Sequence, residues 1–198
     1  MRTLRLVLAL SALAWLPGRA VADPPDPASV IGTFHDTLIA VMKDAKQLGF
    51  EGRYKVLEPA VDHTFNIPLM TQIVTGTRWK TWTDAQKAEI TDAFRRFVIA
   101  TYARRFDGYG GERFETEDAK PFNDGTLVKT ELLHPPDAPV TLTYLMKENG
   151  AQPQAVDVFM TGTISELATR RSEFAAILER SGYQGLLKAL DDKAQEGK

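Results

Sequence analysis

The sequence has 198 residues, of which 43% are hydrophobic and 25% charged, with a formal net charge of −2 and no cysteine. This length fits one domain, and the hydrophobic fraction is too high for a disordered chain and too low for a multi-spanning membrane protein. The missing cysteine excludes disulfides, thiolate metal sites, a thiol nucleophile and a lipid-modified N-terminal cysteine, while the net charge argues against nucleic acid as a partner.

Residues 1–22 have the pattern of a cleaved signal peptide. Arg2 and Arg5 precede the apolar stretch 6–16, Pro17 and Gly18 break it, and 20–22 (Ala-Val-Ala) is a small-x-small cleavage site. The apolar stretch is too short to span a bilayer, although a retained N-terminal anchor is the alternative. Cleavage after Ala22 leaves 176 residues with a net charge of −5, which predicts a soluble, exported, acidic protein.

Residues 23–198 are expected to form a single domain that begins with helices. Asp26 and Pro27 are typical N-cap and first-turn residues, and apolar residues then recur at helical spacing. The sequence predicts helices over 27–48, 54–65, 68–74 and 83–106, with Asn66 as the cap before the third. Thr83 and Gln86 form a capping box at the start of the last of these, and Gly49 is expected to end the first.

The hydrophobic period changes to two over residues 112–162. Alternating sets lie within 140–147 and 156–160, and two less regular runs cover 113–122 and 126–133. Turn-forming residues separate the four runs, so an antiparallel meander is predicted. A Thr163/Glu166 capping box then opens a helix that Gly182 ends, and a last amphipathic helix follows. This order predicts an α+β fold, a twisted antiparallel sheet of about four strands with N- and C-terminal helices on one face.

Motifs of catalysis and metal binding are missing. His35, His63 and His134 lie in different predicted elements without metal-ligand spacing, and we expect them at surface or boundary positions. No serine of residues 23–198 lies in a Gly-x-Ser-x-Gly or Ser-x-x-Lys motif, and the glycine-rich run 108–111 lacks the Lys-Ser/Thr of a phosphate loop. The sequence therefore predicts no metal, no cofactor and no catalytic residue by motif.

Two groups of polar residues allow two interpretations each. Asp157, between two valines of a predicted strand, could be a general base in a pocket. Alternation favours the other interpretation, in which it faces away from its apolar neighbours and meets solvent or caps a helix. Tyr102, Arg104 and Arg105 are ordinary near a helix C-terminus, where cations favour the helix dipole, but they could also contact an anionic group at a pocket mouth.

The most prominent feature of the predicted sheet is a wide apolar face. Its side chains alternate along two strands: Val140, Leu142, Tyr144, Met146, Val156, Val158 and Met160. Flexible methionines suit a wall that adapts to a variable apolar partner. The alternative is that the face simply packs against the helices, and composition does not separate the two.

A set of residues in characteristic order and spacing over about 115 positions carries a family resemblance. They are Trp79, Thr83, Gln86, Phe94, Phe97, Thr101-Tyr102-Ala103, Tyr109, Val128-Lys129-Thr130, Pro139-Val140, Tyr144, Asp157-Val158, Gly162, Ser165-Glu166-Leu167, Arg170-Arg171, Phe174, Gly182, Leu186-Leu187 and Leu190. The sequence resembles the MlaC-like family, the periplasmic lipid-binding component of the Mla and toluene-tolerance transport systems, and specifically its hopanoid-biosynthesis-associated branch.

Two segments bear on the ligand that the resemblance implies. The family usually has a tryptophan shortly before the Asp-Val pair, where this chain has Gln152-Pro153-Gln154-Ala155. Residues 162–171 look more like the hopanoid-associated branch than the phospholipid-shuttle branch. The lipid is therefore left open between a hopanoid and a phospholipid.

The resemblance implies a soluble periplasmic carrier, not an enzyme. Such a carrier takes the apolar part of a membrane lipid into a cavity between sheet and helices, makes only transient membrane contact, and moves between an inner-membrane ABC transporter complex and an outer-membrane acceptor. We expect the cavity to be lined by the seven sheet residues named above, opposed by Phe97 and Phe174 from the helices.

Two rival functions stay open at this stage. One is a small α+β pocket enzyme that uses Asp157 or a histidine as its base. The other is a non-carrier adaptor whose apolar face docks onto a membrane transport complex, and a solid core without a cavity would favour it.

Overall fold

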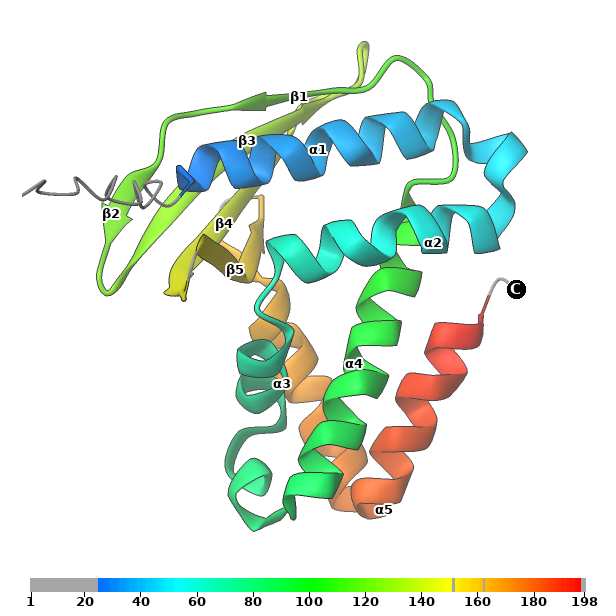
Figure 1. Ribbon diagram of the computed structural model, residues 1–198, viewed down its shortest axis with the longest axis vertical. Coiled ribbons are helices and arrows are strands. Elements are labelled where there is room, and N and C mark those ends of the chain that lie inside the picture. The colour runs from blue at the N-terminus through cyan, green and yellow to red at the C-terminus, as the bar shows by residue number, and fades with distance from the viewer. Residues whose placement is uncertain (1–24, 151, 162, 197–198) are drawn as a thin grey trace, which may run out of the picture.

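The computed structural model describes residues 25–150, 152–161 and 163–196, which form the predicted α+β fold (Figure 1). The helices are α1 (Pro27–Lys43), α2 (Ala45–Thr64), α3 (Ile67–Thr75), the 3-10 helix η1 (Gly76–Thr81), α4 (Asp84–Arg105) and α5 (Glu166–Gln195). The strands are β1 (Arg113–Thr116), β2 (Lys120–Phe122), β3 (Gly125–Leu133), β4 (Val140–Asn149), β5 (Gln152–Met160) and β6 (Ile164–Ser165). The signal peptide predicted over 1–22 lies outside the described residues.

The strands make one antiparallel sheet in the order β1-β3-β4-β5-β6, and β2 also pairs with β3. The long meander β3-β4-β5 agrees with the sequence prediction. The predicted run 113–122 is instead two short strands, because the acidic residues Glu117 and Asp118, which fit poorly in a strand, interrupt it. The sheet therefore has six strands, two more than the four expected.

A bulge in β5 changes which of its side chains share a face. Leu145 pairs with Asp157 and Met146 pairs with Ala155, so Val156 is an extra residue without a partner in β4. A bulge interrupts the alternation of the strand that carries it. The prediction that Val156 alternates onto the same face as Val158 and Met160 is therefore wrong.

Three helix starts are capped as the residue types predicted. The side chain of Asp26 accepts a hydrogen bond from the Ser29 amide, and that of Asn66 accepts one from the Leu69 amide. At α4 the Thr83 side chain accepts from the Gln86 amide while the Gln86 side chain accepts from the Thr83 amide. The reciprocal capping box satisfies amides that have no partner within the helix.

Several helix boundaries differ from the prediction, including the start of α2 at Ala45 where residue 54 was expected. The helix expected over 27–48 stops at Lys43, because Asp44 leaves helical geometry at φ −98° and ψ 11°, and a second kink follows at Gly49 with φ +60°. At α5 the N-cap is Ser165, not Thr163, because Ile164 and Ser165 first pair with β5. Gly182, at φ +64°, kinks α5 at the position where the sequence predicted a helix end.

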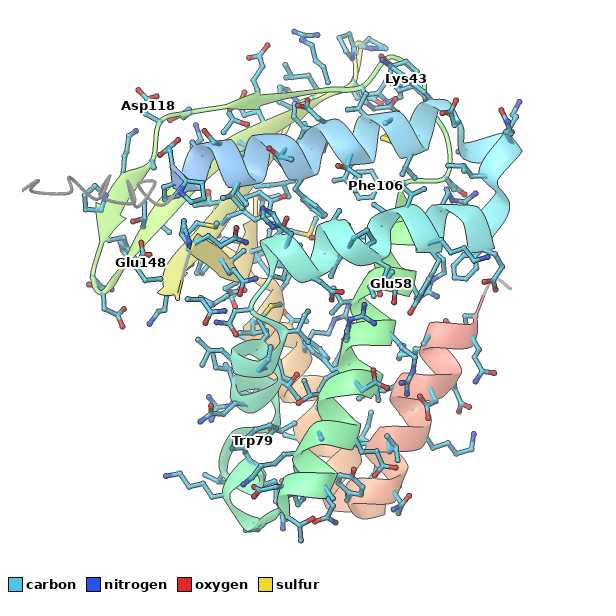
Figure 2. All side chains as sticks on the ribbon, in the orientation of Figure 1. Lys43, Glu58, Trp79, Phe106, Asp118 and Glu148 are labelled. Carbon is cyan, nitrogen blue, oxygen red and sulfur yellow. The ribbon has the colours of Figure 1, made fainter. Side chains whose placement is uncertain are left out.

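The molecule divides into two regions (Figure 1). In the upper part of the view, α1 and α2 lie beside the sheet, and α1 contacts β1, β3 and β5. In the lower part, α3, α4 and α5 pack on one another and extend away from the sheet. Phe106 lies in the first region and Trp79 at the far end of the second, as the labels of Figure 2 show. No helix among residues 25–196 that the structure describes is long and apolar enough to cross a membrane.

Candidate functional site

A cavity of about 480 Å³ lies between the sheet and the helices. This volume falls within the range of roughly 300–1,000 Å³ typical of small-molecule sites. Its apolar wall comes from the sheet, the second half of α4, the start of α5 and single residues of the N-terminal helices. These residues are Met42, Phe65, Met70, Phe94, Phe97, Val98, Tyr102, Phe106, Leu132, Ala138, Val140, Leu142, Tyr144, Val158, Met160 and Leu167.

Strand pairing builds the sheet side of this wall. Leu142 pairs with Met160, and Tyr144 pairs with Val158, so four side chains meet on one face of β4 and β5. Directly opposed side chains of neighbouring strands stand within contact distance of each other. The result is a continuous apolar surface that faces the helices.

Six of the nine residues predicted to line a cavity do so. They are Val140, Leu142, Tyr144, Val158, Met160 and Phe97. The other three, Met146, Val156 and Phe174, are buried away from the cavity. Phe174 packs edge-on against Phe94 and Phe97, with ring centroids 6.1 and 6.3 Å apart, so it supports the wall from behind. A lipid-binding role for these nine residues stays a prediction.

The helix side of the wall contains residues that the sequence argument did not assign to a site. Phe94 and Val98 share one face of α4 with Phe97, and their spacing had predicted only burial, whereas Tyr102 had also been considered for a contact at a pocket mouth. Tyr102 packs against Phe34 and Phe106, and burial raises the pKa of its phenol well above the usual value. Met42, Phe65 and Met70 complete the wall from positions that only the tertiary fold brings close.

His35 is buried, contrary to the expectation of a surface or boundary position. It belongs to the apolar face of α1 with Ile31, Phe34 and Leu38, and only 2% of it is exposed. Its Nε2 lies 2.9 Å from the Tyr144 hydroxyl, while its Nδ1 has no hydrogen-bond partner in the structure. Burial lowers the pKa of His35 to about 3, so the ring is neutral near pH 7.

The other histidines do not join His35. His63 is exposed at the end of α2, and His134 lies at the rim of the cavity. Within the part of the chain that the structure describes, no three His, Asp or Glu side chains gather in a way that could hold a metal ion.

Asp157 holds the start of α5. Its carboxylate accepts hydrogen bonds from the Val158 amide at 2.8 Å, the Leu167 amide at 3.1 Å and the Ser165 hydroxyl at 2.6 Å. Asp157 is only 9% exposed, so the solvent-facing alternative is wrong and the helix-capping alternative describes its contacts. Although Asp157 borders the cavity, both of its carboxylate oxygens already accept hydrogen bonds from the chain.

The rim of the cavity is charged, in contrast to its wall. Arg105, Glu166 and Arg170 border it on the helix side, and Glu112, His134 and Asp137 border it from loops beside the sheet. Of the residues singled out near the end of α4, Tyr102 and Arg105 reach the cavity. Arg104 does not, and it donates instead to the Glu196 carbonyl at 2.8 Å.

Comparisons with known proteins agree with this architecture. The family model described as MlaC protein matches residues 33–192. A phospholipid-binding protein from Ralstonia solanacearum, solved in complex with a phospholipid, has the same fold with a TM-score of 0.75 and 20% sequence identity. The superposition covers 86% of this chain and 97% of that one.

Proposed function

This chain belongs to the MlaC protein family, and on that premise we propose that it is a periplasmic lipid carrier. It binds the apolar part of a membrane lipid in the cavity between sheet and helices. The observation that carries the proposal is the cavity itself, about 480 Å³ in volume and walled mostly by apolar side chains. The similar fold of a protein solved with a phospholipid supports a phospholipid as the cargo, with a hopanoid as the second candidate.

The energetics of such a cavity suit acyl chains. Each buried methylene contributes about 0.8 kcal/mol, so two long chains supply a large gross affinity without any charged group in the wall. Polarizable, flexible Met42, Met70 and Met160 let the wall adapt to chains of different length and unsaturation. This favours binding through the chains, with the lipid's polar end left at the charged rim.

A carrier role also accounts for the contrast between wall and exterior. Water does not solvate acyl chains, so a lipid that crosses the periplasm needs an apolar enclosure. Export by the signal peptide predicted over 1–22 would deliver the chain there. On this proposal the carrier exchanges lipid with an inner-membrane ABC transporter complex and an outer-membrane acceptor, and it touches membranes only transiently.

The two rival functions have less support. An enzyme that used Asp157 as its base would need a free carboxylate, and three donors hold this one at the start of α5. An adaptor with a solid core would have no need of the cavity.

Lipid content tests the proposal directly. Protein purified from a periplasmic extract is treated with mild organic solvent and the extract is analysed by mass spectrometry. Delipidated protein is then incubated with phospholipid vesicles and re-isolated. We expect about one lipid per protein in both cases. Protein that carries no lipid after purification and takes up none from vesicles would overturn the carrier proposal.

The variant Leu142→Glu tests whether lipid lies against the cavity wall. Leu142 lies on the cavity wall, where a carboxylate would have to be buried against the acyl chains at a cost of several kcal/mol unless it became protonated. We expect a folded Leu142→Glu protein, checked by circular dichroism, to retain no lipid. Undiminished lipid in the folded variant would place Leu142 outside the binding site.

A further inference from the structure

The two sides of the cavity rim carry different charged groups, with both arginines on the helix side. On the helix side, Arg105 ends α4 and Arg170 lies in the second turn of α5, with Glu166 between them. On the loop side, Glu112 precedes β1, and Asp137 lies in the connection from β3 to β4. Every one of these residues borders the cavity, and most of the other residues that line it are apolar.

Arg105 keeps its donors available. Its Nη2 lies 4.0 Å from Glu166 Oε2, which is too far for a hydrogen bond, and the described residues offer its guanidinium no hydrogen-bond acceptor. Half of its side chain is exposed, so a ligand can reach it from the cavity mouth. A guanidinium in this state is suited to bind a phosphate, which accepts two parallel N–H bonds.

Arg170 is fixed beside it. It donates to Glu173 at 2.7 Å, and its guanidinium lies over the ring of Phe97, 5.3 Å from the ring centroid. Phe97 is a wall residue, so this contact places a positive charge directly where the apolar wall ends. Arg105 and Arg170 therefore place two guanidinium groups just outside the space proposed for acyl chains, and Glu166 Oε2 lies 4.0 Å from the first and 3.9 Å from the second.

The loop side carries more negative than positive charge. His134 Nδ1 lies 3.7 Å from Glu112 and 3.5 Å from Asp137, so even a protonated His134 supplies one positive charge for two carboxylates. Only 14% of the Glu112 side chain is exposed. Burial opposes its ionisation, but the charge of His134 and hydrogen bonds from the backbone, including the Gly110 amide at 2.6 Å, lower the pKa of Glu112 overall.

From these contacts we infer that the rim is a headgroup site for zwitterionic phospholipids, with the phosphate at Arg105 and Arg170 and the cationic amine at Glu112 and Asp137. The inference rests on the carrier function proposed above. An anionic glycerol headgroup matches the arginines alone, and a diacylglycerol matches neither side. At equal chain length, we therefore expect the protein to prefer phosphatidylethanolamine over phosphatidylglycerol, and phosphatidylglycerol over diacylglycerol.

Competition between lipids with identical chains tests the order. Delipidated protein is incubated with vesicles that contain equal amounts of dioleoyl phosphatidylethanolamine and dioleoyl phosphatidylglycerol, plus dioleoylglycerol at a lower fraction, and its bound lipid is quantified by mass spectrometry. We expect about a fivefold enrichment of the ethanolamine lipid over the glycerol lipid, the size of one partly exposed charge contact.

Variants on each side of the rim separate the two halves of the site. Arg105→Gln should lower the uptake of both phospholipids relative to dioleoylglycerol by about tenfold, as the loss of a charge-assisted phosphate contact predicts. Arg104→Gln removes the same charge from the neighbouring position, which does not border the cavity, and should leave all ratios unchanged. Glu112→Gln and the more exposed Asp137→Asn should each reduce the preference for ethanolamine over glycerol without lowering total phospholipid.

The outcomes distinguish this inference from the carrier proposal. Wild-type protein that takes up lipid with equal amounts of the two headgroups, or Arg105→Gln and Arg104→Gln proteins with identical ratios, would overturn the headgroup site while leaving the carrier intact. Uptake of no lipid at all would overturn the carrier function itself.

Discussion

The two regions of this molecule bury similar side chains, but one region encloses a cavity and the other has a packed interior. The sheet-side region, which includes the ends of α3, α4 and α5 nearest the sheet, surrounds a cavity. The distal region, formed by residues 71–93 and 171–195, has a packed interior, in which Ile90, Leu186 and Leu190 are at most 1% exposed. Among the described residues that line the cavity, none comes from these two distal ranges.

The contrast indicates which region stabilises the fold and which region serves binding. In the distal region Ile90, Leu186 and Leu190 are enclosed by neighbouring side chains, and partly buried rings pack at its edge, such as Trp82 against Tyr183 at a ring-centroid distance of 5.1 Å. A side chain on the cavity wall lacks such partners on one side and loses their dispersion attraction. We therefore expect the distal region to supply most of the stability per residue and the sheet-side region to supply the affinity for lipid.

The largest expected effect compares the same substitution in the two regions. Leu186→Ala, in the solid region, should lower the free energy of unfolding by about 3 kcal/mol, as truncation of a fully packed leucine does. Leu142→Ala, on the cavity wall, should cost less than about 1.5 kcal/mol in delipidated protein, because part of its surface has no packed neighbours to lose. Urea unfolding measures both. Equal losses would contradict the division into a solid and a hollow region.

The junction of the two regions gives the next largest effect. Asp157→Asn leaves the Val158 and Leu167 amides and the Ser165 hydroxyl with a neutral, partly mismatched acceptor. Hydrogen bonds to a charged group contribute about 1.5–3 kcal/mol each, and we expect a net loss of about 2 kcal/mol in the free energy of unfolding. Asp118→Asn, in an exposed loop, is the matched control and should change stability by less than about 0.5 kcal/mol. Identical stability of the two variants would contradict the helix-capping role of Asp157.

Filling the cavity should affect binding more than stability. Val158→Trp adds a large apolar side chain at a wall position in the middle of β5, where aromatic residues suit a strand. We expect at least a tenfold loss of lipid affinity, about 1.4 kcal/mol, with no loss in the free energy of unfolding of the delipidated protein. The readout is equilibrium binding of a fluorescent phospholipid. Unchanged affinity in a folded variant would show that lipid does not occupy the space beside Val158.

The smallest effect is a pH dependence that originates beside the cavity. The pKa of His35 is about 3 in the folded protein and 6.5 for a free side chain, so the unfolded chain binds a proton that the folded one excludes between these values. This contribution to stability is complete above pH 6.5 and is lost as the pH falls towards 3. Between pH 7.0 and pH 5.5 it lowers the free energy of unfolding by about 1.2 kcal/mol.

The variant His35→Gln isolates that contribution. Glutamine can still hydrogen-bond to the Tyr144 hydroxyl but does not titrate. Denaturant unfolding at pH 7.0 and pH 5.5 should therefore show a smaller loss for the variant than for the wild type, by about 1.2 kcal/mol. Parallel losses in the two proteins would contradict the burial of a neutral His35.

Local chemistry predicted most of the fold. The caps at Asp26, Asn66 and Thr83 and the alternation along β4 are short-range patterns, and the structure confirms them. The errors lie where a local signal competes with pairing elsewhere in the chain. The N-cap is Ser165 and not the predicted Thr163, because Ile164 and Ser165 pair with β5 before α5 begins.

The sequence predicted the residues of the site less well than it predicted the helices and strands. Periodicity identifies an apolar face but not whether that face is filled, so Met146 and Leu142 look alike in the sequence although only Leu142 borders the cavity. The bulge at Val156 and the burial of His35 depend on partners far along the chain, which no local pattern encodes. The rim could not be predicted from the sequence either, because Arg105, Glu112 and Arg170 border one cavity only in the folded chain.

Photolabelling tests the central claim, that lipid occupies the hollow region, most directly. Delipidated protein is loaded with a phosphatidylethanolamine that carries a diazirine near the end of one acyl chain, irradiated, digested and mapped by mass spectrometry. We predict labelled residues within 94–106 and 140–160, the stretches of α4, β4 and β5 that supply most of the wall. Labels confined to residues 71–93 and 171–195, or to the outer surface, would contradict the account.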